Sequence, residues 1–162
     1  MLTNRTTVVA TTLQQVLKDN AENLGLKDVW FGDQDTFPRV PCVAVEPVDM
    51  VRPDPTPMMI SFHEMECYIT VYDIAIGNQD KLQLATDQLA EQIADTIHAD
   101  PDTNEVGPLF PDGRLWTLRG TLTIGWVTRI EHGFAVKGGK LMRCARLTYV
   151  GRSRVPILMT GG

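Results

Sequence analysis

The chain has 162 residues, of which 43% are hydrophobic and 22% charged, and this predicts one globular domain over residues 1–162 rather than two. The formal net charge of -5 excludes a basic surface over the whole chain of the kind that binds nucleic acid, although a local basic patch stays compatible with it. No apolar run approaches the roughly 20 residues that span a bilayer, and no signal peptide is recognisable, so we expect a soluble, non-secreted protein without a membrane partner.

The first predicted element is an amphipathic helix from about Arg5 to Asn23. Gly25 is placed to end it in a left-handed conformation. Because a helix of this length is marginal in water by itself, we expect it to pack on a sheet. Its apolar stripe consists of Val9, Leu13, Val16, Leu17 and Leu24.

Two short strands are predicted next, at Val29-Trp-Phe31 and at Cys42 to Val45, the second of them buried on both faces. The residues between them include Phe37-Pro-Arg-Val-Pro41, which is extended because residues before proline avoid the helical region. Prolines at 47, 53, 55 and 57 then predict an irregular arm near 46–60. Arg52 in this arm is a candidate partner contact, and an ordinary surface loop is the alternative.

The longest strand is predicted from Phe62 to Ile76. Alternation places Met65, Cys67, Ile69 and Val71 toward the core and puts Glu64, Glu66, Tyr68, Thr70 and Tyr72 on the other face. Tyr68 and Tyr72 are therefore candidates for contact with a neighbouring subunit, and ordinary cross-strand packing is the alternative.

A second helix is predicted from a cap at Asn78 to about His98. Its apolar residues are spaced three and four apart, which gives it one sheet-facing side. An irregular segment near 100–113 contains three prolines and follows the helix. Leu109 and Phe110 lie near its tip and are candidates for docking to a partner.

The last third is predicted to form antiparallel strands. One strand alternates from Trp116 to Trp126 and is interrupted at Gly120, and the return strand runs from Leu141 to Gly151. Between them lies a glycine-rich hairpin tip near 131–140, where Phe134 and Lys137 are candidate contacts. Its Gly138-Gly139-Lys140 does not match a phosphate loop, because the first required glycine is Phe134 and Leu141 follows the lysine.

The return strand and its end carry most of the positive charge of an acidic chain. Arg146 and Arg152 are the candidates there for an exposed patch that contacts a partner, and salt bridges to the acidic end of the long strand are the alternative. The complete set of candidate interface residues is Arg52, Tyr68, Tyr72, Leu109, Phe110, Phe134, Lys137, Arg146 and Arg152.

The cysteines offer little sign of a metal site. Cys42, Cys67 and Cys144 are an odd number, lie far apart and fall in apolar stretches, so buried reduced thiols are expected. A zinc site formed by His63, Cys67 and Cys144 is the alternative, but the spacing lacks any Cys-x-x-Cys pair. We expect no metal and no cofactor.

No catalytic motif is recognisable, whether of the serine hydrolase, zinc protease or dinucleotide-binding type. Glu64 and Glu66 suggest an acid–base pair, and they could act in a small ligand-binding or hydrolytic domain together with His63 and His132. A solvated strand end explains the two acids more simply. We therefore expect no catalytic residue and no enzyme activity.

The predicted order α-β-β-β-α-β-β defines an α+β fold, a mostly antiparallel sheet with two helices packed on one face. With this order and chain length the sequence resembles the tail terminator, or tail-completion, proteins of long-tailed bacteriophages. The resemblance is carried by the opening helix, by Val29-Trp-Phe31 leading to Phe37-Pro-Arg-Val-Pro41, by the strand Tyr68-Ile-Thr-Val-Tyr72 running into the Asn78 helix, and by the closing strand ending Arg146-Leu-Thr-Tyr149.

The resemblance implies a structural virion protein. Such a protein forms a hexameric ring with copies of itself at the head-proximal end of the tail tube, binds the tail tube protein and a neck or connector protein, and lets DNA pass through its lumen without specific binding. It is assembled in the host cytoplasm and resides at the tail–neck junction of the virion. Another neck component, such as a head–tail adaptor or a head-closure protein, is the alternative within the same class.

Overall fold

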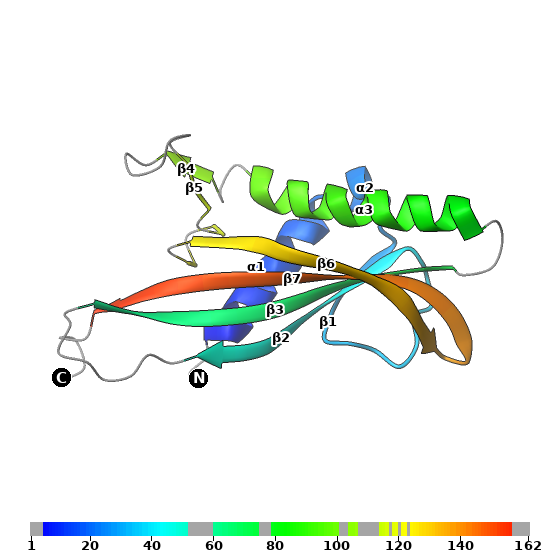
Figure 1. Cartoon of the computed structure of the whole chain (residues 1–162), viewed down its shortest axis with the longest axis horizontal. Coiled ribbons are helices and arrows are strands. Elements are labelled where there is room, and N and C mark those ends of the chain that lie inside the picture. The colour runs from blue at the N-terminus through cyan, green and yellow to red at the C-terminus, as the bar shows by residue number, and fades with distance from the viewer. Residues whose placement is uncertain are drawn as a thin grey trace.

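The structure is a computed structural model that describes residues 5–51, 60–74, 79–100, 104–106, 114–116, 118–119, 121–122 and 124–156. Arg52, Leu109 and Phe110 lie outside the described residues. The helices are α1 (Arg5–Asp19), α2 (Ala21–Leu24) and α3 (Gln79–Ala99), and the strands are β1 (Asp28–Phe31), β2 (Cys42–Val51), β3 (Ile60–Ile74), β4 (Asn104–Val106), β5 (Arg114–Trp116), β6 (Ile124–Lys137) and β7 (Lys140–Pro156) (Figure 1).

Five strands form one sheet in the order β1-β2-β3-β7-β6, and β4 and β5 form a separate two-stranded sheet. The pairs within the large sheet are antiparallel except for β1 and β2, which run parallel. The predicted α+β fold is confirmed, with a mixed rather than purely antiparallel sheet. β1 runs parallel to β2 because the chain does not turn back in a hairpin between them but crosses by the longer segment from 32 to 41.

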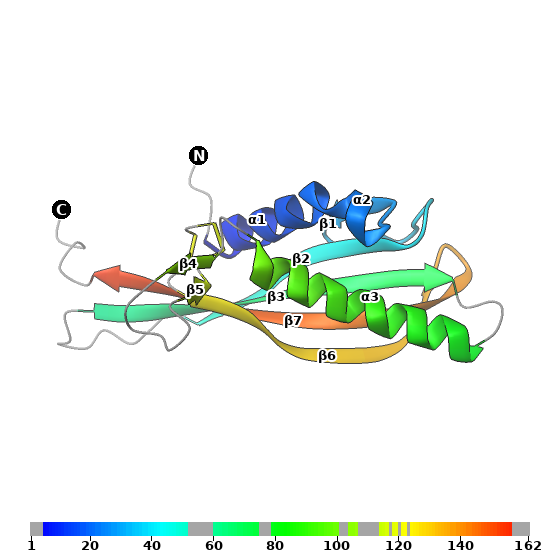
Figure 2. The same cartoon turned by 90° about the horizontal axis from the view of Figure 1, so that it is seen from above.

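Both long helices, α1 and α3, lie on the same side of the sheet, as Figure 2 shows. The main core fills the space between these helices and the sheet. Met65, Cys67, Ile69 and Val71 all face this core with at most 1% of their surface exposed, as the alternation in the sequence predicts. None of the described helices lies on the opposite side of the sheet, and we call that side the open face.

The first helical segment is broken near its predicted end. Asn20 separates α1 from α2, and its side-chain amide donates to the carbonyl of Val16 at 2.8 Å. This bond is of the kind by which asparagine competes with helical hydrogen bonding. Gly25 follows α2 with a φ of 72°, so the predicted left-handed cap is confirmed.

The predicted irregular arm near 46–60 is wrong over its first part. β2 continues through Pro47 to Val51, and a register shift between Pro47 and Asp49 accommodates the proline, which cannot donate to a ladder. Val48 at this bulge is exposed. The strand therefore continues past Pro47, because the pairing with β3 is long and a single bulge accommodates the missing donor.

The predicted strand from Trp116 to Trp126 is also wrong. β5 ends at Trp116 and β6 begins at Ile124, and the chain turns between them. In this turn Leu118 and Arg119 adopt φ values of 48° and 54°, which are costly for residues other than glycine. Burial of Leu118 and the ion pairs of Arg119 stabilise this turn. The alternation of apolar and polar residues along the sequence predicts neither of them.

The predicted hairpin tip near 131–140 is shorter than expected. β6 runs on to Lys137, and only Gly138 and Gly139 form the turn, with φ values of 58° and 74°. Two consecutive residues with positive φ are the geometry that a tight hairpin requires, and glycine adopts it without strain. Gly133 remains inside the strand.

Candidate functional site on the open sheet face

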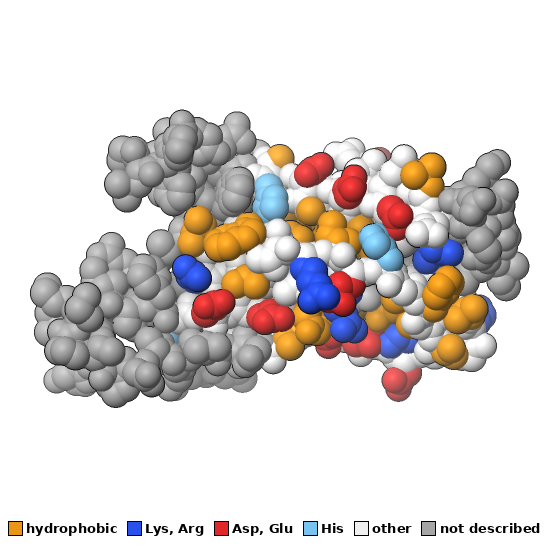
Figure 3. Space-filling view, viewed as in Figure 1, with side chains coloured by type: hydrophobic (Ala, Val, Ile, Leu, Met, Phe, Trp, Pro, Cys, Tyr) orange, Lys and Arg blue, Asp and Glu red, His pale blue; other side chains and the backbone are white. Residues whose placement is uncertain are grey.

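The open face presents the outward side chains of β2, β3, β7 and β6, and it is the side seen in Figure 3, where acidic, basic and apolar side chains all reach the surface. No helix of the described chain covers it. Among the described residues, no helix is long and apolar enough to cross a membrane.

Tyr68 and Arg146 form the central feature of this face. Thr70 pairs with Arg146 in the register of β3 and β7, which makes Tyr68 a diagonal neighbour of the arginine. The guanidinium carbon lies 4.5 Å from the centre of the tyrosine ring, so the cation is held by the ring face. No described residue forms an ion pair with Arg146, and its donors therefore point to solvent in a defined orientation.

A recess of about 210 Å³ adjoins Arg146. Gly133 leaves room for it because this strand position carries no side chain, and Thr70, Glu131 and Cys144 are among the residues that border it. The recess is small, so it fits a single side chain of a partner better than a whole ligand. Arg146 on its rim is the group to which an acidic side chain of a partner would bind, while Glu131 borders the recess across from it.

Two other arginines of the face pair with acids at the surface. Arg152 lies 3.9 Å from Glu64, and Arg129 lies 3.4 Å from Glu131, and all four side chains are largely exposed. Pairs of this kind contribute about 0–1 kcal/mol each. Of the two alternatives for the basic strand, a salt bridge to the acidic strand therefore describes Arg152. An exposed patch describes Arg146, which forms no such bridge.

Tyr72 is not available to a neighbouring subunit in the way that the sequence predicts. It is only 3% exposed, because the segment from 32 to 41 folds over this end of the open face and places Phe37 against it, with ring centres 4.5 Å apart. Its hydroxyl donates to Asp33 at 2.7 Å. Alternation along the strand predicted the correct side of the sheet, but not the loop that covers it.

Lys137 binds the same loop, which leaves only 14% of its side chain exposed, and its role as a partner contact stays a prediction. Its ammonium lies 2.7 Å from the other carboxylate oxygen of Asp33 and above the rings of Phe37 and Tyr72. Burial acts to raise the pKa of Asp33, but the hydrogen bonds from Lys137 and Tyr72 outweigh it and leave that pKa below its ordinary value. Burial and the bond to Asp33 together raise the pKa of Tyr72. Asp33 was not singled out in the sequence, where it reads only as a turn residue.

Phe134 remains exposed, as the hairpin interpretation predicts. Its side chain is 56% exposed near the end of β6, and the guanidinium of Arg143 lies 4.8 Å from its ring centre. Arg143 itself is 7% exposed, so it packs beneath the phenyl ring rather than forming part of a basic surface.

The residues of the hydrolytic alternative are not brought together. His132 faces α3 and lies 2.9 Å from Asp87, whereas Glu64 and Glu66 point from the open face. His63 and His132 pair with positions 153 and 145 of β7, eight residues apart, which separates them by about 26 Å at 3.3 Å per residue. The register therefore rules out a shared site for these four residues.

The zinc alternative fails for a similar reason. Cys67 points into the main core, and Cys144 lies across from Tyr72 on the opposite side of the sheet. Over the described part of the chain, no group of three or more histidine, cysteine or acidic residues is arranged to hold a metal ion. Burial raises the pKa of both the Cys42 and Cys67 thiols to about 12, as expected for inert structural cysteines.

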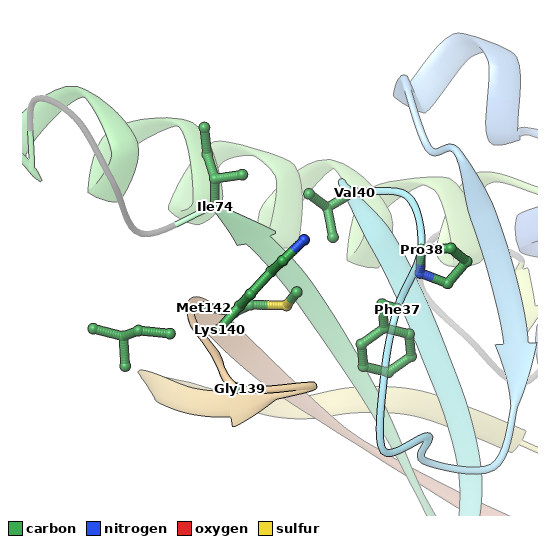
Figure 4. A pocket seen from close by; sticks show the side chains of 8 residues that line it. Phe37, Pro38, Val40, Ile74, Gly139, Lys140 and Met142 are labelled. Atoms are coloured by element: carbon green, nitrogen blue, oxygen red, sulfur yellow. The ribbon is translucent and has the colours of Figure 1, made fainter.

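A second feature is an apolar cavity of about 610 Å³ beside the hairpin turn, shown in Figure 4. It lies between the segment from 32 to 41, the end of β3 and the start of β7. The extended Phe37-Pro38 segment is the one feature of this cavity that the sequence predicts. Its lining residues are Phe37, Pro38, Val40, Ile74, Gly139, Lys140, Leu141 and Met142.

Comparison of the sequence with protein-family models and with curated proteins finds no match. The geometry of the open face and the resemblance described above therefore carry the functional argument.

Proposed function

We propose that this protein is a structural subunit of a bacteriophage tail, which forms a ring that closes the head-proximal end of the tail tube and joins it to the neck. The order of the elements and the chain length support the proposal through the resemblance to tail terminators. The observation that carries it is the open face, a broad sheet surface with an oriented and unpaired arginine at its centre.

This face suits contact with another protein better than binding of a small molecule. Arginine and tyrosine are the residue types that most often dominate protein–protein interfaces, and stacking on Tyr68 orders Arg146 before any partner binds. The recess beside Arg146 is too small to enclose a typical ligand, since such pockets measure roughly 300–1,000 Å³. A neighbouring subunit that offers a carboxylate would pair with Arg146 and cover the sheet.

A ring requires two different surfaces on each subunit, one for each neighbour. The open face serves as one of them. The net charge of -5 is compatible with a lumen through which DNA passes without binding.

The direct test combines the purified protein with polymerising tail tube protein and images the product by electron microscopy. We expect a ring at one end of each tube and an arrest of tube growth when the protein is in excess. Tubes that grow to the same length with no terminal ring would contradict the proposal. Binding to a neck protein but not to the tube would favour the head–tail adaptor or head-closure alternative.

The role of the open face is tested by Arg146→Glu. We expect ring formation to fall at least about tenfold, because an exposed anchor of reversed charge repels the carboxylate it should bind. The matched control is Lys18→Glu, which reverses an exposed charge on α1. Both variants should keep the wild-type melting temperature, and equal assembly by both would argue against the open face.

A further inference from the structure

Exposed apolar side chains gather at one end of the molecule. Among the described residues, eight large hydrophobic side chains are exposed, and four of them lie at the β6–β7 hairpin or at the adjacent end of β3. These four are Ile74, Phe134, Val136 and Leu141, exposed by 50–67%. A concentration of this kind indicates an interaction site, whereas scattered single residues do not.

The hairpin carries apolar groups on both of its sides. Phe134 and Val136 are two positions apart on β6, so their side chains share one side of the hairpin, and neither of them lines the cavity, whereas Leu141, which pairs with Val136, reaches its edge. We call Phe134 and Val136 the apolar knob. The other side of the hairpin carries Met142, which lines the apolar cavity (Figure 4).

The apolar cavity is held in shape by bonds between the hairpin turn and the loop opposite it. The amide of Gly138 donates to the carbonyl of Asp35 at 2.8 Å, and Lys137 binds Asp33 at 2.7 Å. The cavity is therefore present before a partner arrives, which lowers the entropic cost of binding.

The lining of the apolar cavity selects an apolar occupant. Lys140 is the one charged residue among the described residues that line it, and a lysine stem can lie along an apolar wall while its ammonium stays in water. None of these described lining residues offers a carboxylate, histidine or hydroxyl group, so a polar ligand would lose hydrogen bonds to water without replacement by them. Its volume of about 610 Å³ falls within the roughly 300–1,000 Å³ of pockets that enclose a drug-sized ligand, so two side chains fit inside.

The geometry points to a head-to-tail contact between two copies of this chain, in which the apolar knob of one copy enters the apolar cavity of the next. A protruding apolar patch and a complementary pocket on the same chain form a heterologous contact, since each copy uses a different surface toward each neighbour. Because the knob and the cavity lie on opposite sides of one thin hairpin, the contact repeats from copy to copy and closes as a ring or extends as a filament. The inference rests on the proposed ring for its closure.

The first test compares three variants by sedimentation velocity over a range of concentrations. Val136→Asp disables the knob and Ile74→Asp disables the cavity, both at exposed positions where the fold tolerates an acid, and Val8→Asp on α1 is the matched control. We expect each of the first two changes to weaken self-association at least about tenfold, and the control to leave it unchanged.

A mixture of the two disabled variants gives the sharper result. The intact knob of the Ile74→Asp chain can enter the intact cavity of the Val136→Asp chain, but neither remaining surface can continue the series. We therefore expect the mixture to form a dimer and nothing larger. If Ile74→Asp has no effect while Val136→Asp prevents binding to the tube, the knob contacts the tube protein and the inference is overturned.

A cross-link separates this inference from the proposed function. Chains with Val136→Cys and differently tagged chains with Val40→Cys are mixed, and diamide takes up the two electrons and two protons released as the thiols form a disulfide. We expect a higher yield of the mixed disulfide than of either disulfide-linked homodimer. The yield is measured in the free protein at up to about 1 mM and in rings assembled on tubes. Rings without this disulfide would overturn the inference and leave the proposed function intact. The disulfide without rings would support the contact between copies and contradict the proposed function. If neither the disulfide nor self-association is observed, the proposed contact is overturned.

Discussion

Arg119 joins the ends of two helices, and its removal offers a quantitative test of the tertiary structure. Its guanidinium forms two hydrogen bonds with Asp100, at 3.0 and 2.9 Å, and a third with Asp19 at 2.8 Å. Asp19 is the last residue of α1, and Asp100 directly follows α3. The hydrogen bonds that Arg119 donates to Asp100 raise the pKa of Arg119, so the guanidinium stays charged in any practical buffer.

The exposure of the two acids sets the size of the effect. The Asp100 side chain is 4% exposed and that of Arg119 is 22% exposed, so removal of the arginine leaves a nearly buried carboxylate without its main partner. Breaking a buried ion pair in this way costs about 3–5 kcal/mol, and because the arginine itself reaches solvent we expect about 2–4 kcal/mol for Arg119→Met. Denaturation by urea, followed by tryptophan fluorescence, measures this change.

A double-mutant cycle then separates the two acids. The coupling of Arg119 to Asp100 should be about 2 kcal/mol, whereas its coupling to Asp19, whose side chain is 45% exposed, should be clearly smaller because solvent screens it. The variants are Arg119→Met, Asp100→Asn, Asp19→Asn and the two pairs. Equal couplings, or a coupling to Asp100 below about 0.5 kcal/mol, would refute the reasoning from burial.

Three further predictions concern the packing and the loop. In Gly151→Ala the added Cβ would collide with the side chain of Leu122, so we expect a loss of about 1–3 kcal/mol in the free energy of unfolding. Tyr149→Phe removes a buried hydroxyl that has no hydrogen-bond partner among the described residues, so the free energy of unfolding should stay the same or rise by up to about 1 kcal/mol. The lowered pKa of Asp33 means that its ion pair with Lys137 stabilises the fold above the unfolded-state pKa near 4 and is lost as the pH falls through the folded-state value. Lys137→Met should therefore destabilise at pH 7 and make less difference at pH 2, measured by thermal unfolding at both values.

The controls for these predictions use neighbouring positions. Gly133→Ala places its Cβ 4.0 Å from the sulfur of Cys144, an ordinary contact, so it should be tolerated where Gly151→Ala is not. Lys140→Met removes an exposed cation near the same hairpin turn, and it should show no such dependence on pH. A loss of more than about 1 kcal/mol in Tyr149→Phe would mean that the hydroxyl has a partner in solution.

The sequence by itself determined the features that depend on local periodicity. The apolar positions of α1 and α3 repeat every three or four residues, and Met65 to Val71 alternate on β3, so the helices and the inward side of the long strand were predicted correctly. Gly25 and the pair Gly138-Gly139 were also recognisable, since their turns need φ values that glycine adopts most easily. These are properties of a residue and its near neighbours.

Only the tertiary structure decided what covers each surface. Tyr68 and Tyr72 have the same place in the alternation, yet the segment from 32 to 41 buries Tyr72 and leaves Tyr68 beside an exposed Arg146. The turn at Leu118 and Arg119 likewise depends on the core and on acids up to 100 positions away in the chain. Periodicity predicts the side to which a residue points, but the segment that packs against it is chosen by contacts between distant parts of the chain.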